Sequence, residues 1–143
     1  MPIVTMLHGT SVELGKYTDA LDSFNKSTKI DPKNVAFWIN RGNVLLKLNK
    51  SQEAIASYDK AIGLNPSSST AWYGKGVALN QSGKYQDALN SYNQAIQFSP
   101  SNAAAWHGKG LVLKSLNSTD ESEKASSKAN ELGFKNSTKS GIA

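Results

Sequence analysis

One period runs through this chain, and it restricts the possible folds more than any other feature of the sequence. Trp38, Trp72 and Trp106 lie 34 residues apart. The same step connects five further sets of matching residues, which are Gly42, Gly76 and Gly110; Leu45, Leu79 and Leu113; Ala20, Ala54 and Ala88; Phe24, Tyr58 and Tyr92; and Pro32, Pro66 and Pro100. Because so many residue types share one period, the sequence indicates an array of structural repeats.

Each repeat is expected to form two antiparallel helices. The first helix begins just before the tryptophan and ends at a turn near Gly83 and its equivalents. The second helix extends to the proline, because Ala88, Tyr92 and Ala95 fall on one stripe at helical spacing. Proline cannot continue a helix. The polar residues that follow it offer oxygens to cap the next helix, and they are Ser67, Ser68, Ser101 and Asn102.

Small residues mark the places where two helices of this array approach each other closely. Gly76 and Ala88 leave room for a facing aromatic ring, so leucine at either position should destabilise the fold by overpacking. The tryptophans are expected to be largely buried, because each ring can bury about 150–250 Å² of surface. The sequence therefore predicts a mainly helical chain with about eight helices and no sheet.

These residues resemble the tetratricopeptide repeat family, whose pattern W-x-x-L-G-x-x-Y, A-x-x-x-F and P is met by WYGKGVAL, ALNSY and Pro100. WINRGNVL, AIASY and Pro66 form another unit, and WHGKGLVL opens a third. The resemblance implies an all-α fold, a right-handed α–α superhelix of antiparallel helix pairs with about four repeats. The tetratricopeptide repeat domain is expected at residues 1–133, with repeats at about 1–34, 35–68, 69–102 and 103–133. Residues 134–143 are expected to form a frayed tail.

The first and last repeats depart from the family pattern. The first has Val4, His8 and Ser11 where the others have Trp, Gly and Leu, so its first helix should be short. In the last repeat, Ser122 and Ser126 replace the alanine and the aromatic residue of the second helix. This polar second helix suits the end of a stack, because a terminal repeat must present a hydrophilic face to water.

Charged residues also recur with the period. A cation stands where the family has leucine, at Arg41, Lys75 and Lys109. Their stems are expected to pack while their charged ends reach water. Acidic residues recur at the same step, at Glu53, Asp87 and Glu121, and could form weak ion pairs with these cations.

Composition argues against several partners. The net charge is +5, but Arg41 is the single arginine, whereas recognition of phosphates and bases favours arginine, so nucleic acid is not expected as a partner. The absence of cysteine excludes disulfides and thiolate zinc sites. No apolar run has the length of a membrane span or the form of a signal peptide. A soluble, cytoplasmic protein with no membrane partner is the expectation.

The sequence lacks the residue patterns that catalytic sites and metal sites require. His8 and His107 are the only histidines and are not equivalent in the repeat, which disfavours a shared metal site. No G-x-S-x-G motif is present, and the GKG stretches at 74–76 and 108–110 fall inside expected helices, so they are interpreted as packing glycines. The sequence therefore predicts no enzymatic activity, no metal and no cofactor.

The resemblance implies a ligand groove on the concave face that the first helices line. Counted from each tryptophan, the candidate groove residues are Asn40, Asn43, Lys47, Tyr73, Val77, Asn80, His107, Leu111 and Lys114. Gly74 and Gly108 are expected to face this groove as well. Asparagines can hold a peptide backbone, lysines favour acidic residues, and Tyr73 could act as the central anchor. The predicted function is a protein interaction module, an adaptor or scaffold that binds a peptide or partner protein.

Two alternatives remain at this point. The chain could be a structural or self-associating segment of a larger assembly, with homo-oligomers formed through the solenoid ends; this rests on the apolar residues Ile3, Val4, Met6 and Leu7. One subgroup of the family clamps the C-terminal carboxylate of heat-shock chaperones. The resemblance does not extend to that clamp, because apolar or small residues occupy its polar positions, namely Ile39, Gly74, Ala104 and Gly108.

Overall fold

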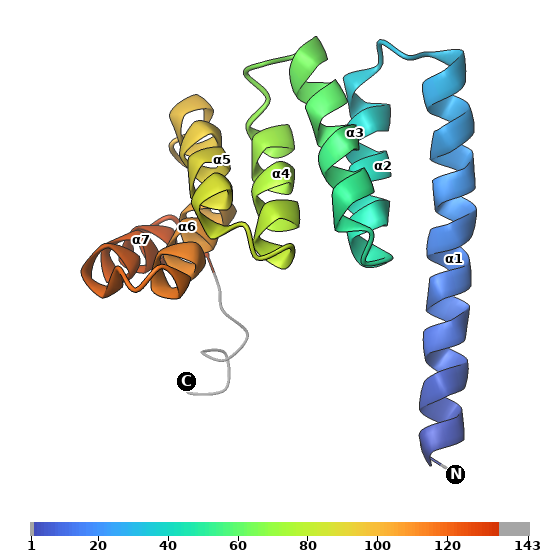
Figure 1. The fold of residues 1–143 in the computed structure, drawn as a ribbon, viewed down its shortest axis with the longest axis horizontal. Coiled ribbons are helices and arrows are strands. Elements are labelled where there is room, and N and C mark those ends of the chain that lie inside the picture. Colours follow the sequence, from blue (N-terminus) through green and yellow to red (C-terminus); the bar gives the residue numbers. More distant parts are fainter. Residues whose placement is uncertain (1, 135–143) are drawn as a thin grey trace. The chain divides into compact units, whose positions relative to one another are not determined.

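The computed structural model describes residues 2–134, and their side chains from Val12 onward. Within this range the chain forms seven helices and no strand (Figure 1): α1 Pro2–Ile30, α2 Val35–Lys47, α3 Ser51–Leu64, α4 Ser69–Gln81, α5 Tyr85–Phe98, α6 Ala103–Ser115 and α7 Thr119–Glu131. The predicted all-α fold is confirmed, although the described residues contain seven helices rather than about eight. Residues 135–143 of the expected tail lie outside the described residues.

Polar side chains fix where the first helices begin. The side-chain oxygens of Asn34, Ser68 and Asn102 each accept a hydrogen bond from the backbone N–H three residues later, at the start of α2, α4 and α6. These bonds satisfy donors that have no partner within the helix. The predicted caps at Ser68 and Asn102 are therefore confirmed.

A residue with positive φ follows each of these first helices. The angles are 59° at Asn49, 76° at Gly83 and 64° at Asn117. This left-handed conformation ends a helix, and glycine and asparagine adopt it at low cost. Since the three residues occupy equivalent positions, the predicted turn near Gly83 and its equivalents is confirmed in three repeats.

The first repeat has no such turn. α1 is one helix of 29 residues that continues through Gly15, the equivalent of Gly83, so the prediction of a short separate first helix is wrong. The sequence supplies a physical reason, because His8 stands at the position of Gly42. A Cβ added at Gly42 would lie 2.7 Å from the Tyr58 ring. A first helix that carries histidine at this position cannot approach its second helix so closely.

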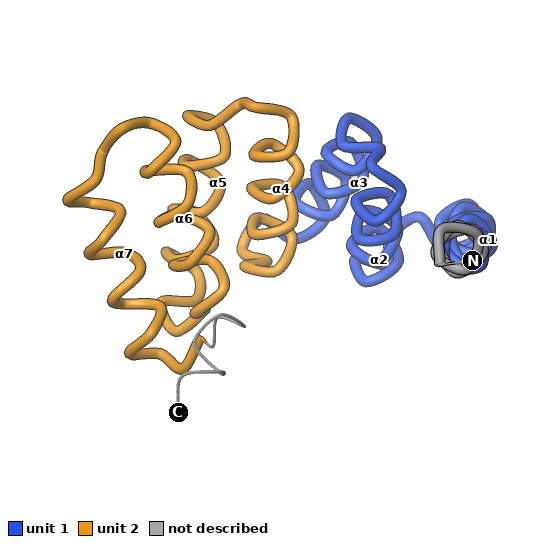
Figure 2. The backbone as a smooth tube through the Cα atoms, turned by 90° about the horizontal axis from the view of Figure 1, so that it is seen from below, with its two compact units in different colours: residues 1–66 blue, residues 67–143 orange. Residues whose placement is uncertain are grey.

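The chain divides into two compact units, residues 1–66 and 67–143 (Figure 2). In the first unit, α2 packs against α3 and also contacts α1. Leu45 of α2 and Ala54, Tyr58 and Ala61 of α3 are fully buried. The core of this unit therefore lies mainly between α2 and α3.

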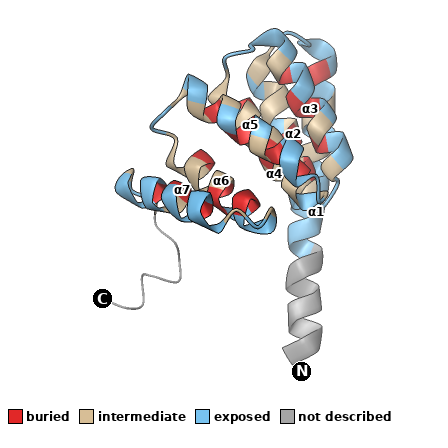
Figure 3. Cartoon of the chain, turned by 60° about the vertical axis from the view of Figure 1, so that its left-hand side comes forward, coloured by how far each residue is buried: buried red, intermediate tan, exposed pale blue. Residues whose placement is uncertain are grey.

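In the second unit, α4 pairs with α5 and α6 pairs with α7, while α6 also packs on α5 and contacts α4. The ring of Tyr92 lies between two glycines, because a Cβ at Gly76 of α4 would stand 2.7 Å from it and one at Gly108 of α6 would stand 2.6 Å from it. The close approach predicted at Gly76 is confirmed. Gly108 is buried against Tyr92, so the expectation that it faces the groove is wrong. Figure 3 shows buried residues on α5, α6 and α7, with exposed residues elsewhere on the same helices.

The three tryptophans are mostly buried, and each retains some exposed surface. A cation from the next helical turn lies over each ring: Arg41 Cζ is 5.9 Å from the Trp38 centroid, Lys75 Nζ 5.6 Å from Trp72, and Lys109 Nζ 5.2 Å from Trp106. These distances permit cation–π attraction. The prediction of largely buried tryptophans is confirmed, and each ring also lies beside a cation.

Arg41 also forms hydrogen bonds to two neighbouring helices. Its Nε donates a hydrogen bond of 2.7 Å to Oδ1 of Asn25 in α1, and its Nη1 donates one of 2.5 Å to Oγ of Ser57 in α3. One side chain of α2 thus connects all three helices of the first unit. Its guanidinium group bonds these two helices while the residue stays partly exposed.

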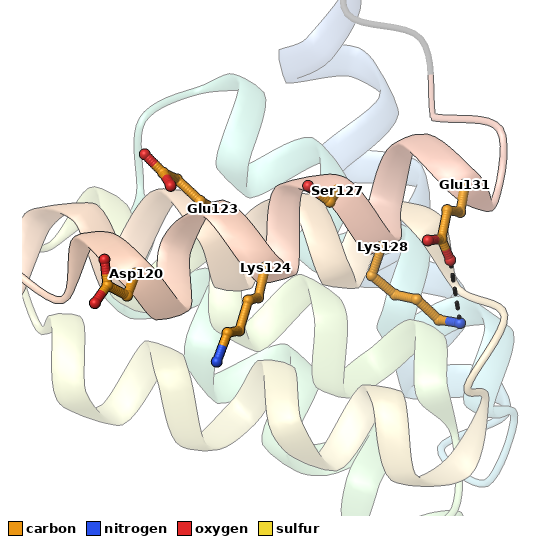
Figure 4. Close-up of a pocket in the computed structure, with 6 residues that line it drawn as sticks. All are labelled: Asp120, Glu123, Lys124, Ser127, Lys128 and Glu131. Carbon is orange, nitrogen blue, oxygen red and sulfur yellow. Dashed lines mark ion pairs between the residues drawn. The ribbon is translucent and has the colours of Figure 1, made fainter.

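The outer face of α7 is hydrophilic, as predicted for a terminal repeat. Figure 4 shows acidic, basic and hydroxyl side chains along this face, namely Asp120, Glu123, Lys124, Ser127, Lys128 and Glu131. Lys128 Nζ lies 3.6 Å from Glu131 Oε2. The buried residues of the helix are small: Ser122, Ala125 and Ala129.

Candidate functional site

The nine predicted groove residues lie on the first helices of three repeats. Asn40, Asn43 and Lys47 belong to α2; Tyr73, Val77 and Asn80 to α4; His107, Leu111 and Lys114 to α6. α4 and α6 contact each other within the second unit, whereas α2 belongs to the first unit. The structure therefore brings six of the nine residues into one unit, and a single groove across three repeats stays a prediction.

The three residues of α2 are all exposed. Asn43 has an internal role as well, because its Oδ1 accepts a hydrogen bond of 2.5 Å from the Tyr58 hydroxyl. That bond orients the Asn43 amide and leaves its NH₂ group as the part suited to a ligand carbonyl. Asn43 is thus better placed to donate to a bound peptide than to accept from it.

The three residues of α4 are half-buried. The Tyr73 ring lies 5.8 Å from the Tyr92 ring, with 46° between their planes. Burial raises the pKa of the Tyr73 hydroxyl. Burial, and to a smaller extent the nearby Tyr73, raise the pKa of Tyr92. Tyr73 therefore stays protonated at neutral pH and supports its neighbour's ring, so it is only partly available as a ligand anchor.

The residues of α6 differ in exposure. Leu111 is 48% exposed and Lys114 is exposed, whereas His107 is half-buried. The ring of Phe134 lies stacked on the His107 imidazole, with centroids 4.1 Å apart. Burial lowers the pKa of His107, which favours the neutral imidazole. Phe134 was expected in the frayed tail, but it packs against the candidate groove instead.

A hollow of about 580 Å³ opens between α6 and α7, and three predicted groove residues line it: His107, Leu111 and Lys114. The other residues that line this α6–α7 hollow are Gly110, Thr119, Ser122, Glu123, Ser126, Ser127 and Asn130. Sequence reasoning missed the contribution of α7. The available signal was Ser126, which stands where other repeats carry a large aromatic residue.

Two other kinds of site can be checked over the described part of the chain. No helix among residues 2–134 is both long and apolar enough to span a membrane. The same residues contain no group of three or more His, Cys, Asp or Glu side chains arranged to hold a metal ion.

The comparisons with known proteins identify a repeat family. The tetratricopeptide repeat model matches the chain three times, over residues 11–69, 39–103 and 81–129. These matches overlap and together extend from residue 11 to residue 129, which is most of the chain. No curated protein matches the chain in sequence.

Several solved structures are similar to this one. A crystal structure of MamA is 27% identical, covering 83% of this chain and 70% of that one, with a TM-score of 0.78. YrrB, a TPR protein with an unusual peptide-binding site, is 23% identical, covering 85% of this chain and 63% of that one, with a TM-score of 0.74. The first TPR of Spaghetti (RPAP3), bound to an HSP90 peptide, is 24% identical, covering 80% of this chain and 91% of that one, with a TM-score of 0.70. The last two likenesses concern the fold alone.

Proposed function

Because this chain belongs to the tetratricopeptide repeat family, we propose that it is a non-catalytic interaction module that binds a peptide or partner protein along the first helices of its repeats. One observation carries the proposal. Leu111, a large apolar residue, is 48% exposed on α6, one turn before the exposed Lys114. An apolar contact beside a cation, on the face predicted for ligand, suits a partner that is both apolar and acidic.

The neighbouring residues support a ligand of this chemistry. Asn43 and Asn80 offer amide groups to a peptide backbone, and Lys47 and Lys114 favour acidic side chains. Two of the similar structures are titled as peptide-binding proteins, which is consistent with this use of the fold. Because exposed charges are screened by salt, binding should weaken as ionic strength rises.

The experiment uses two matched pairs of variants. Leu111→Ala on α6 is paired with Phe98→Ala on α5, since both residues are exposed and apolar, at 48% and 39%. Lys114→Ala on α6 is paired with Lys124→Ala on the outer face of α7 (Figure 4). Proteins retained by the parent chain from a lysate are identified by mass spectrometry, and one is purified. Its affinity for all five chains is then measured by calorimetry, after circular dichroism has confirmed folding.

We expect Leu111→Ala to weaken binding about tenfold or more, as for an interface hot spot of about 1.4 kcal/mol. Lys114→Ala should have a smaller effect that shrinks at high salt. The two control variants should bind like the parent. The proposal fails if Phe98→Ala or Lys124→Ala abolishes binding while both α6 variants bind normally, because the partner would then use the second helices.

A second candidate function is self-association as a structural segment. Val12 and Leu14 of α1 are 46% and 45% exposed, which leaves apolar surface on this helix. Ile3, Val4, Met6 and Leu7, on which this prediction also rests, precede the described side chains. Light scattering over a range of concentrations tests it: a molar mass that rises with concentration in the parent, and not in Val12→Ser/Leu14→Ser, would favour this function.

A further inference from the structure

The α6–α7 hollow lies where other repeats hold an aromatic ring. Tyr58, Tyr92 and Ser126 occupy equivalent positions of their second helices. The tyrosine side chains are almost fully buried, at 0% and 2% exposure. Each ring lies against the glycine of its own first helix, because a Cβ at Gly42 or Gly76 would stand 2.7 Å from it. An aromatic ring is thus a constant part of these helix pairs.

The last repeat keeps the glycine and lacks the ring. Around Gly110, the nearest atoms to an added Cβ would be Ser126 Oγ at 2.6 Å, and backbone atoms of Ser122 and Ser126 at 3.3 and 3.4 Å. Ser122 remains buried, and its hydroxyl donates a hydrogen bond of 2.7 Å to the Gly110 carbonyl. The two helices therefore stay paired through small residues, and the hollow of about 580 Å³ remains beside them.

Side chains around the hollow suit an aromatic guest with a polar tip. Leu111 supplies an exposed apolar contact on α6. Ser126 and Asn130 of α7 supply hydroxyl and amide groups that can bond a phenol. His107 also lines the hollow, and Phe134 is stacked on its imidazole with 16° between the rings. The volume falls within the range of about 300–1,000 Å³ that is typical of small-ligand sites.

We propose that the α6–α7 hollow is a binding site for an aromatic side chain, tyrosine above all, of the ligand. This inference rests on the proposed function, because it specifies one contact of the proposed peptide or protein partner. The guest ring lies in the hollow beside Ser126, which occupies the place of the tyrosine in the other repeats. Lys114 of α6 and Glu123 of α7 also line the hollow, and they contact charged residues of the ligand next to the aromatic one.

Residues 135–143 are not the expected source of this ring, because they contain no Phe, Tyr or Trp. Phe134 itself lies on the imidazole of His107, at 4.1 Å between centroids, and is not among the residues that line the hollow. A ring from another molecule is therefore the occupant to test.

The test uses the full chain and a small probe, 4-methylphenol, which is the side chain of tyrosine. The probe is titrated into the ¹⁵N-labelled parent while amide shifts are recorded by NMR. We expect saturable shifts at Gly110, Ser122 and Ser126, with a dissociation constant of order millimolar for so small a ligand. The saturated analogue 4-methylcyclohexanol should bind at least about threefold more weakly. Equal binding of the two compounds, or no saturable shift with 4-methylphenol, would overturn the proposal.

Three variants test whether the probe binds in the hollow. Ser126→Tyr restores the ring that the other repeats carry and should abolish the response to 4-methylphenol. Asn93→Tyr adds the same side chain at an exposed position of α5 and should leave the response unchanged. Leu111→Ala removes an exposed contact without adding volume. It should therefore lower the affinity for the probe several-fold, and this result does not depend on whether Ser126→Tyr folds well. If the folded Ser126→Tyr or Leu111→Ala chain binds the probe like the parent, the probe lies elsewhere and the proposal is wrong.

The probe experiment needs no partner, so its failure is distinguishable from failure of the proposed function. If 4-methylphenol does not bind but Leu111→Ala still weakens binding of a purified partner, the proposed interaction module is supported and the aromatic site is refuted. If the probe binds as expected and the α6 variants leave the partner unaffected, the partner contacts another surface, and the proposed function fails together with the role assigned to this hollow.

Discussion

The ring of Phe134 lies stacked on the imidazole of His107, with 4.1 Å between centroids and 16° between the planes. Phe134 follows α7, whereas His107 belongs to α6, so the contact joins the end of the last repeat to its first helix. The backbone N–H of Phe134 donates a hydrogen bond of 2.9 Å to the Ala129 carbonyl, which fixes the turn that brings the ring back. The stacked ring removes water from one face of His107, and burial lowers the pKa of this imidazole.

Substitution Phe134→Ala should raise the pKa of His107. Without the ring, water regains access to the imidazole and the charged form is penalised less, so the pKa should move back toward 6.5. NMR titration of the imidazole protons measures this directly. Phe98→Ala, which removes an exposed ring from α5, is the matched control and should leave the His107 pKa unchanged. An unchanged pKa in Phe134→Ala would mean that other residues bury the imidazole.

The lowered pKa of His107 also predicts how stability depends on pH. The folded chain binds this proton less readily than the unfolded chain, whose histidine titrates near 6.5. The stabilising contribution is therefore complete above that value and is lost as the pH falls through the folded pKa. Urea unfolding between about pH 7.5 and 5.5 should show a steeper loss of free energy in the parent than in His107→Gln. Equal slopes for the two chains would contradict this prediction.

Two glycine-to-alanine substitutions should differ in their effect on stability. Gly76→Ala places a methyl group 2.7 Å from the buried Tyr92 ring, so overpacking should cost about 1–3 kcal/mol. Gly63 lies in α3 with no atom within 4 Å of an added Cβ. Gly63→Ala should therefore be neutral or stabilise by up to about 1 kcal/mol, because alanine favours the helix. Thermal and urea unfolding measure both changes, and a Gly76→Ala chain as stable as the parent would refute the packing assigned to Tyr92.

Arg41 and Lys109 should respond differently to exchange of their charged groups. Arg41→Lys keeps a cation near Trp38 but cannot form both hydrogen bonds to Asn25 and Ser57, so it should cost about 1–3 kcal/mol. Lys109→Arg keeps a cation over Trp106 and should change stability by no more than about 0.5 kcal/mol. Urea unfolding compares them. If Arg41→Lys unfolds like the parent, the two bonds make no net contribution.

Structural features that recur in every repeat could be predicted from the sequence. Predictions were wrong or missing where one repeat lacks a residue that the other repeats share. Periodic tryptophans, glycines and prolines fixed the helix pairs, and the caps at Ser68 and Asn102 followed from short-range hydrogen bonding. The cation over each tryptophan was missed because helical pitch, not periodicity alone, brings residues three apart together. The hollow beside Ser126 was missed because a missing side chain was interpreted only as a polar end to the stack. The candidate groove was predicted from the resemblance, and its extent across the repeats stays a prediction.

The last prediction concerns the continuity of α1, where the structure differs most from the expected repeat. Gly15 and Gly83 occupy equivalent positions, but Gly83 has a φ of 76° whereas Gly15 lies inside α1. No atom lies within 4 Å of a Cβ added at Gly15. Gly15→Ala should therefore stabilise the chain by about 0.5–1 kcal/mol, because alanine replaces glycine in an exposed helix interior. Gly83→Ala should destabilise the chain, because the left-handed backbone conformation costs alanine about 1–2 kcal/mol. Urea unfolding of the two variants side by side decides the matter: if Gly15→Ala loses stability as Gly83→Ala does, the backbone turns at Gly15, and the first repeat folds into two helices like the others.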